Sequence, residues 1–393
     1  MLKKMSWRSA APIELSADEK GASEAARARS SGHRTLILVS SYRGQPSCSE
    51  LARLAAAGQR PRKDYVEVAR LLNADVVDST YIEDNALPVA RALAGTVGYP
   101  AGQVAEAALR ATRYDHICAW SERTGLPLAL LFKIARRDAD LVLVSSWLSG
   151  GAKSFMVGSL GVHTHCRAIV SYSTSQMDIA ATRLGVPRNK LHLALQPVDE
   201  QFWRPSQGAS TNLICSVGSS GRDYATLFAA IDHLDLELHV GVGAGDIPAR
   251  GLERRLDRGA PPPNVTMRHF GPTELRNLYA SARFVVLALE DVEYDAGVTA
   301  LTEAMAMGKA VILTRTRGQL DVLRDGVQGL YVPPRDPRAL RAAIEHLLAH
   351  PEEAQRMGRA GRALVEEQHA LTSYVSRLAA IIRGTAATTA LTL

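Results

Sequence analysis

Short apolar runs alternate with amphipathic segments along most of the chain. In the first half, runs rich in aliphatic residues predict strands at 35–42, 74–80, 115–120, 140–148, 167–173 and 190–195. Segments with helical apolar spacing predict helices at 63–73, 125–137, 150–161 and 175–186. Residues 43–62, rich in Ser, Gly, Pro and Arg, predict a loop or a short helix. This order of elements predicts a parallel sheet covered by helices.

The same alternation starts again after about residue 208. Apolar runs predict further strands at 212–218, 236–243, 265–271, 283–289 and 310–314. Amphipathic segments predict helices at 222–234, 272–282, 297–307, 336–350, 351–368 and 372–383. Thr273 is the expected N-cap of the second of these helices. The second half therefore predicts another domain of the same kind.

A chain of 393 residues is long for one hydrophobic core, which supports this division into domains. The predicted fold class is α/β, with two Rossmann-like, doubly wound parallel-sheet domains that face each other across a cleft. We expect a flexible tail at 1–30, an N-terminal domain at 31–205 and a C-terminal domain at 206–370. Residues 371–393 are expected to form a helix that returns to the N-terminal domain, followed by a short tail.

Composition restricts the classes of protein to which the chain can belong. Apolar runs stay well short of the roughly 20 residues that span a bilayer, and the start has no secretory pattern. The four cysteines form no C-x-x-C pair, which favours buried thiols in a reducing cytoplasm. The net charge of +6 is spread along the chain, so no basic stripe indicates nucleic-acid binding. We predict a cytoplasmic protein and leave open a weak peripheral contact with an anionic membrane at its inner surface.

The most informative stretch is EDVEYDAGVTALTEAMAMGKAVILTRTRGQLDVLRDGVQGLYVPP (290–334). An acidic loop runs into Gly297, where a helix of small and apolar residues begins, with Glu303 as its one carboxylate. A buried carboxylate needs partners, and sugar hydroxyls are suitable donors to it. Thr299 lies one turn before Glu303, near a helix N-terminus that favours phosphate. The alternative is that Glu303 is an ordinary solvated helix residue.

This stretch resembles the donor-site signature of the retaining glycosyltransferases with the two-Rossmann GT-B fold, group 1, which include sucrose-phosphate synthases and bacterial mannosyltransferases. The run from Glu303 through Gly308 to Ile312 matches the second part of that signature, and Asp295 lies eight residues before Glu303. The resemblance implies that Asp295 contacts the donor sugar and Glu303 the ribose, both as catalytic-site acids. Because the glycine is displaced by one position, Glu293 or Asp291 are alternatives to Asp295.

The resemblance also implies a diphosphate site made by two neighbouring segments. Amides around Gly297, Val298 and Thr299 would contact the diphosphate and sugar. The segment SVGSSGRDYATL resembles the loop that opens the family's donor domain, which implies donor contacts from Gly218 and Arg222. Two serines stand where the family usually has an arginine, and Arg222 stands near the usual lysine. The alternative for Arg222 is a surface residue at a helix start.

The N-terminal half carries less of the resemblance. Gly44 lies where the family often has a glycine-rich loop, and His116 and Glu122 are the nearest candidates for acceptor-side groups. His116 precedes an apolar strand, which also fits a structural role. His163 and His165 form a pair without an evident third ligand, so we expect no metal there.

The activity implied by the resemblance is transfer of a sugar, hexosyltransferase-like, from a nucleotide-sugar donor to an acceptor hydroxyl. The resemblance implies retention of configuration, no required metal and no cofactor besides the nucleotide-sugar co-substrate. Two alternatives stay open: a nucleotide-sugar epimerase of the same fold, and a non-catalytic nucleotide-sugar binder. The residues do not specify the base, the sugar or the acceptor.

Overall fold

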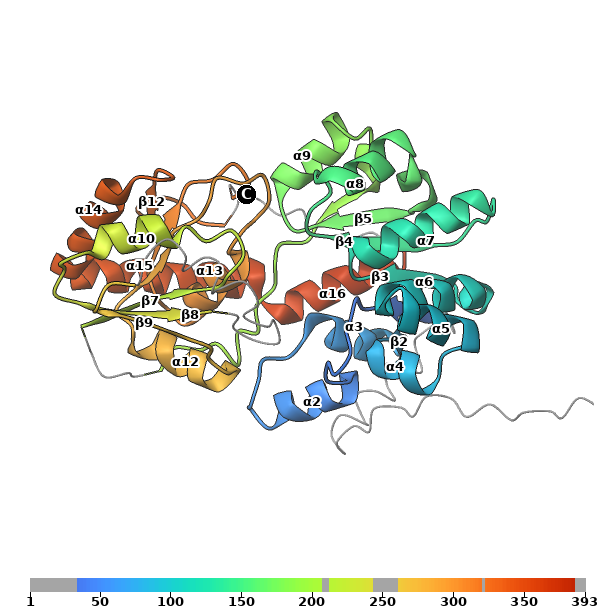
Figure 1. Ribbon diagram of the computed structural model, residues 1–393, viewed down its shortest axis with the longest axis horizontal. Helices are drawn as coiled ribbons and strands as arrows, with labels where there is room; N and C mark the ends of the chain where they lie inside the picture. Colours follow the sequence, from blue (N-terminus) through green and yellow to red (C-terminus); the bar gives the residue numbers. More distant parts are fainter. Residues whose placement is uncertain (1–33, 207–211, 243–260, 320–321, 386–393) are drawn as a thin grey trace, which may run out of the picture.

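The computed structural model describes residues 34–206, 212–242, 261–319 and 322–385. These residues form two lobes, each built on a parallel sheet (Figure 1). The expected tail at 1–30 lies outside the described residues. The blue and green N-terminal lobe is on the right of Figure 1, and the yellow and orange C-terminal lobe is on the left.

The N-terminal sheet has the strand order β2-β1-β3-β4-β5-β6, with all described pairs parallel. Its strands are β1 (Thr35–Leu38), β2 (Asp75–Val77), β3 (His116–Ala119), β4 (Leu141–Ser145), β5 (Ala168–Ser171) and β6 (Leu191–Leu193). Its helices are α2 (Cys48–Ala56), α3 (Asp64–Leu72), α4 (Ser79–Asp84), α5 (Pro88–Thr96), α6 (Tyr99–Arg110), α7 (Glu122–Ile134), α8 (Gly151–Ser154) and α9 (Thr174–Thr182).

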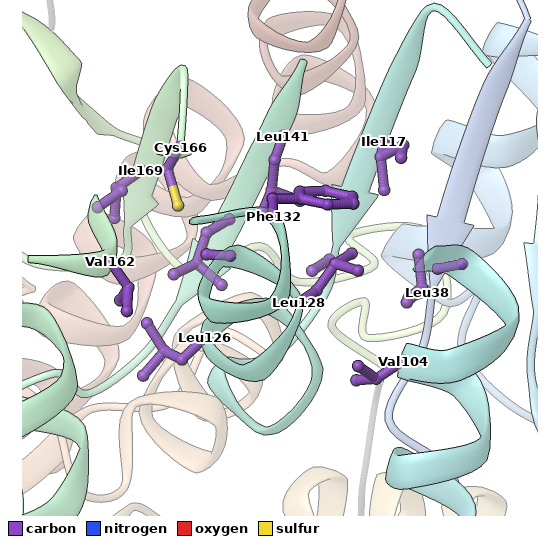
Figure 2. Packing of buried hydrophobic residues seen from close by; sticks show 14 of the residues in the cluster. Leu38, Val104, Ile117, Leu126, Leu128, Phe132, Leu141, Val162, Cys166 and Ile169 are labelled. Carbon is purple, nitrogen blue, oxygen red and sulfur yellow. The ribbon is translucent and has the colours of Figure 1, made fainter. Parts of the chain in front are cut away.

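Helices cover both faces of this sheet. Along β1, Leu36 and Leu38 belong to one core and Ile37 to the other, as the two-residue period of a strand requires. On the first face, α7 packs Leu128 and Phe132 among strand residues, as Figure 2 shows. The second face is covered by α3 and by α16 (Leu371–Ile382). Burial on both faces explains why these strands are continuously apolar.

The C-terminal sheet has the order β12-β11-β10-β7-β8-β9 and is also parallel. Its strands are β7 (Leu213–Val217), β8 (Glu237–Gly241), β9 (Val265–Arg268), β10 (Val285–Leu287), β11 (Val311–Thr314) and β12 (Gly329–Val332). One face is covered by α12 (Pro272–Ser281) and α13 (Val298–Ala306). The other is covered by α10 (Tyr224–Ile231), α14 (Pro337–Ala349) and α15 (Pro351–Leu364).

The chain crosses between the lobes twice, and the two crossings pair with each other. Val198 forms a parallel bridge with Ala370, and its amide donates to the carbonyl of His369 at 2.9 Å. Asp199 lies beside this bridge and accepts a 2.6 Å hydrogen bond from Nη2 of Arg62 in the N-terminal lobe. The returning chain then forms α16, whose Leu378 and Ile382 are buried in the N-terminal core.

The structure adds elements that the hydrophobic pattern did not predict. The pattern predicts no helix or strand at 81–114, yet most of these residues lie in α4, α5 and α6. The buried positions of α5 and α6 are mostly small or polar residues (Ala, Gly, Gln and Glu), so their buried faces are difficult to recognise in the sequence. The predicted N-cap at Thr273 is wrong: α12 begins at Pro272, and Gly271 is its N-cap. Proline suits this first position because its missing N–H would lack a helical partner.

Candidate functional site

The centre of the C-terminal sheet is its topological switch point. β7 and β10 are neighbours there, and the chain leaves them toward opposite edges of the sheet. The loops after the two strands are joined by the Arg222–Leu289 bridge and by a 3.0 Å hydrogen bond from the Glu290 amide to the Gly221 carbonyl. Open α/β sheets bind ligands at this position. The sequence candidates from residues 218–222 and 295–303 all lie on these loops or on the helix that follows.

Helix α13 begins directly at this junction. Its N-cap, Gly297, has φ +82°, a left-handed conformation that favours glycine. Val298 is buried, whereas Thr299 is exposed on the first turn. The side-chain amide of Gln319 donates to the carbonyl of Ala296 and so holds the turn before the helix. The first amides of α13 therefore form a fixed N-terminus that favours an anion.

Arg222 lies behind this helix N-terminus and is only 6 % exposed. Its Nε and Nη1 donate to the carbonyls of Val217 and Ser220, each at 2.8 Å. A Cβ on Gly218 would come within 2.1 Å of this guanidinium, and one on Gly297 within 3.2 Å. Two glycines thus make room for one buried cation. The alternative of a surface residue at a helix start is wrong for Arg222.

Glu303 lies one turn after Thr299 and is half-buried. The hydroxyl of Tyr279 donates to its Oε2 at 3.1 Å. Burial raises the pKa of Glu303 to about 7, opposed by this hydrogen bond and by the charge of Lys63 from the N-terminal lobe. Burial also raises the pKa of Tyr279 well above its usual value, so that residue is a neutral donor. The alternative of an ordinary solvated carboxylate is wrong for Glu303.

The three acids before α13 have different surroundings. Asp291 pairs with Arg317, whose Nε lies 3.3 Å from Oδ2. Glu293 pairs with the same arginine at 3.6 Å and with Arg183 of the N-terminal lobe at 3.4 Å. Asp295 is buried, and its carbonyl accepts from the Val298 amide at 3.2 Å in the first turn of α13. Of the three acids, Asp295 is the one that is buried beside the helix start.

The acidic loop also contacts the opposite lobe. The side-chain amide of Gln176 on α9 donates to the carbonyl of Glu293 at 2.8 Å. The rings of Trp147 and Tyr294 lie 5.0 Å apart between centroids, one from each lobe. These contacts bring the loop after β4 close to the start of α13. The two lobes therefore meet beside the candidate site.

The three N-terminal candidates have different locations. Gly44 lies in the exposed loop after β1, with φ +78°, at the carboxyl edge of the sheet. Glu122 begins α7 at the same edge, and its Oε1 accepts from the Ser146 and Trp147 amides, each at 2.7 Å. Glu122 is only 6 % exposed. It therefore orders the loop that carries Trp147, and its carboxylate is already occupied by hydrogen bonds.

The structure places His116 at the edge of the sheet opposite to that of Gly44 and Glu122. It is the first residue of β3, so it lies at the amino edge of a parallel sheet. Its Nδ1 is 2.9 Å from Oδ2 of Asp140, which also binds Arg167 at 2.5 Å. The prediction of His116 as an acceptor-side group is therefore wrong, and the histidine belongs to a structural cluster at the far edge.

Sequence reasoning missed several residues of the site. Tyr279 and Gln319 reach Glu303 and the α13 turn from elements that are distant in sequence. Lys63 faces Glu303 from the other lobe. Trp147 lies near the carboxyl end of the strand predicted at 140–148 and follows the observed β4, and that position was an available signal.

Two Rossmann-like sheets, with a candidate anion site at the switch point of the second, define the GT-B class of fold. Residues 222–350 match the sequence model of the family described as Glycosyl transferases group 1. The C-terminal half of this chain therefore carries a glycosyl transferases group 1 domain. No curated protein matches the chain in sequence.

Solved structures with the same fold cover most of the chain. HepE of Anabaena, in complex with UDP-glucose, is similar with a TM-score of 0.65 and 15 % identity, over 90 % of this chain and 100 % of that one. Sucrose-phosphate synthase from Thermosynechococcus elongatus has a TM-score of 0.64 and 16 % identity, over 90 % of this chain and 98 % of that one. A glycosyltransferase from Rickettsia africae has a TM-score of 0.60 and 14 % identity, over 90 % of this chain and 99 % of that one. At these identities the likeness establishes the fold.

Within the described residues, no helix is both long and apolar enough to cross a membrane.

Proposed function

We propose that this protein transfers a sugar from a nucleoside-diphosphate sugar to an acceptor hydroxyl. The observation that carries the proposal is the arrangement of Arg222, the start of α13 at Gly297, and Glu303 one turn further along the helix. The glycosyl transferases group 1 domain supports the same reaction class. HepE, which shares the fold, was solved in complex with UDP-glucose, which supports a nucleotide-sugar donor.

Each group has a role that fits its chemistry. The amides of Gly297 and Thr299 at the start of α13 bind the diphosphate, next to Val298, whose amide already donates to Asp295, and the charge of Arg222 stabilises the diphosphate from behind. Gly218 gives the donor and the guanidinium close access to the backbone. Glu303 accepts hydrogen bonds from the ribose hydroxyls.

Catalysis then rests on charge stabilisation at the leaving group. Negative charge that develops on the departing diphosphate meets the α13 dipole and the Arg222 guanidinium. We propose retention of configuration, with the acceptor proton taken by the leaving phosphate on the same face of the sugar. Asp295, at the start of α13, faces the donor sugar in this arrangement. No metal or cofactor is required by the mechanism.

Nucleotide binding tests the site directly. Thermal shift and calorimetry against UDP, GDP, ADP and dTDP should show at least one nucleotide that stabilises the protein. Glu303→Ala should abolish that shift, and Glu345→Ala, which changes an exposed glutamate of α14, should leave it unchanged. No response to any of the four nucleotides in the wild type would refute the donor site.

Product analysis tests the reaction itself. Incubation with the matching nucleotide sugar and a panel of hydroxyl acceptors should release nucleoside diphosphate only when a glycosylated product forms. NMR of the product's anomeric proton should show the donor's configuration, and excess EDTA should leave the rate unchanged. A changed sugar still linked to its nucleotide would identify an epimerase, and binding without turnover would identify a binder.

The predicted cytoplasmic location and membrane contact remain part of this proposal. The net charge of +6 supports a weak electrostatic attraction to anionic lipid. Sedimentation with phosphatidylglycerol vesicles should exceed that with phosphatidylcholine vesicles and should decrease as salt is added. Equal sedimentation with both vesicle types would remove the membrane contact and leave the transferase proposal intact.

A further inference from the structure

A second cluster of ligand-type side chains lies at the corner between α14 and α15. Within the residues described, it is the one group of three or more His, Cys, Asp or Glu residues whose ligand atoms lie close enough together to share one cation. Its members are His346, His350 and Glu353, and their ligand atoms all lie within 4.8 Å of one another. His163 and His165 do not belong to this group.

The corner is distant from the candidate donor site. Nη2 of Arg283, two residues before β10, donates to the carbonyl of Leu348 at 2.7 Å. The end of α14 therefore lies at the amino edge of the sheet, whereas α13 begins at the carboxyl edge. Figure 1 shows α14 at the outer end of the C-terminal lobe, away from the N-terminal lobe.

The contacts of the three side chains already resemble those around a bound metal. Nε2 of His346 lies 3.0 Å from Oε2 of Glu353. Nδ1 of His350 lies 2.8 Å from the carbonyl oxygen of His346. A histidine that donates through Nδ1 to a backbone carbonyl has its Nε2 available as a ligand, which is the usual arrangement in metal sites.

Distances and exposure allow the three groups to converge. Ligands at about 2.0–2.1 Å around a tetrahedral zinc ion are separated from one another by about 3.4 Å. The His346–Glu353 pair is already at 3.0 Å, and the histidine rings lie 4.4 Å apart between centroids. The two rings are stacked, so one of them must turn before both can point a nitrogen at the same ion, and the 42 % exposure of the His346 side chain leaves room for that turn. Arg356, 3.7 Å from Oε1 of Glu353, contacts the oxygen that the metal would leave free.

We propose that His346, His350 and Glu353 bind one divalent transition-metal ion, with Zn²⁺ as the best match, and that water completes its coordination. Two imidazole nitrogens and one carboxylate oxygen suit zinc, cobalt, nickel or copper better than Mg²⁺. The ion connects α14 to α15 across the turn at Pro351. Its effect is to stabilise this corner of the C-terminal domain, without taking part in sugar transfer.

Metal titration of the full chain, prepared without a polyhistidine tag, tests the proposal. Calorimetry with Zn²⁺ should show one equivalent bound, and Co²⁺ should give the visible absorption of a low-coordinate nitrogen and oxygen site. Saturating Zn²⁺ should raise the Tm by about 2–4 °C. His346→Ala and His350→Ala should each weaken binding at least about tenfold, because each removes a ligand.

His233→Ala is the matched control, since it removes an exposed histidine of the same domain that pairs with Asp232. It should leave Zn²⁺ affinity unchanged. Glu353→Gln provides a conservative second test, which keeps the size of the side chain while removing its charge, and it should also weaken binding. The absence of saturable Zn²⁺ binding, or full affinity retained in the His346→Ala/His350→Ala double variant, would overturn the proposal.

Discussion

The hydroxyl of Tyr279 donates a 3.1 Å hydrogen bond to the carboxyl of Glu303, from a ring that is fully buried beside α13. This contact holds one oxygen of the carboxyl while leaving it further acceptor capacity. Because burial raises the pKa of Glu303 to about 7, its charge changes within the physiological pH range.

Nucleotide binding should depend on the ionisation of Glu303. Hydroxyl donors stabilise the carboxylate, so affinity should rise between pH 6 and pH 8, by up to about tenfold per pH unit below the pKa. Glu303→Gln should bind more weakly and lose this component of the pH dependence. Calorimetry at several pH values checks the difference, and equal pH profiles for both proteins would contradict the assignment.

The same carboxyl should make the folded protein less stable as pH rises, whereas it makes nucleotide binding stronger. Its pKa is raised in the folded protein, so its favourable contribution is complete below about pH 4 and is lost as pH rises through about 7. Relative to Glu303→Gln, the free energy of unfolding of the wild type should fall by on the order of 2 kcal/mol between pH 5 and pH 8. Urea unfolding at both pH values measures this, and a constant difference would show a normal pKa.

Tyr279→Phe should shift the pH midpoint of nucleotide binding upward by about one unit, because the lost hydrogen bond favours the ionised carboxylate. Tyr331→Phe, which removes another hydroxyl of the same domain, is the control and should leave the midpoint in place. A midpoint unchanged in Tyr279→Phe would mean that the hydroxyl does not influence Glu303.

Gly218→Ala should both destabilise the protein and weaken nucleotide binding. Gly218 has φ +113°, and a Cβ there would displace the Arg222 guanidinium. Gly58→Ala is the matched control, because its φ is +68° but a Cβ would meet nothing within 4 Å. The control should lose about 1 kcal/mol of unfolding free energy, and Gly218→Ala should lose more than that. Equal losses in thermal unfolding would show that Arg222 moves aside without consequence.

Asp199→Ala should lower the free energy of unfolding by about 2–4 kcal/mol, since it leaves the largely buried Arg62, beside the crossing between the lobes, without its closest partner. Glu200, 3.6 Å from the same guanidinium, limits the loss. Asp178→Ala removes an exposed ion pair with Arg188 and should change stability by less than about 1 kcal/mol. Chemical unfolding of both variants compares the two pairs, and similar losses would contradict a structural role for Asp199.

The sequence predicted the two sheets well because strands buried on both faces are recognisable as continuous apolar runs. It also placed Glu303 and Gly297 on one helix, since their spacing is local. It could not give the partner of Glu303, because Tyr279 lies on another helix. Nor could it show that Arg222 turns inward, which depends on two glycines from separate loops.

The error on His116 has a different origin. The residue begins its strand, and in a parallel sheet the first residues of the strands lie opposite the ligand-binding edge. The position of His116 within the predicted strand was therefore enough to exclude it. Glu122 does lie at the carboxyl edge, but its hydrogen bonds to the loop after β4 appear only in three dimensions.

The pairing of the two chain crossings has a consequence for folding during synthesis. Helix α16 fills one face of the N-terminal core, yet it follows the whole C-terminal domain in sequence. As the chain leaves the ribosome, the apolar face formed by Ile37, Val142 and Val170 is therefore covered only in part, by α3, until residues 371–382 emerge. Folding of the first lobe is completed last, and chaperone contact with the nascent chain is expected at that face.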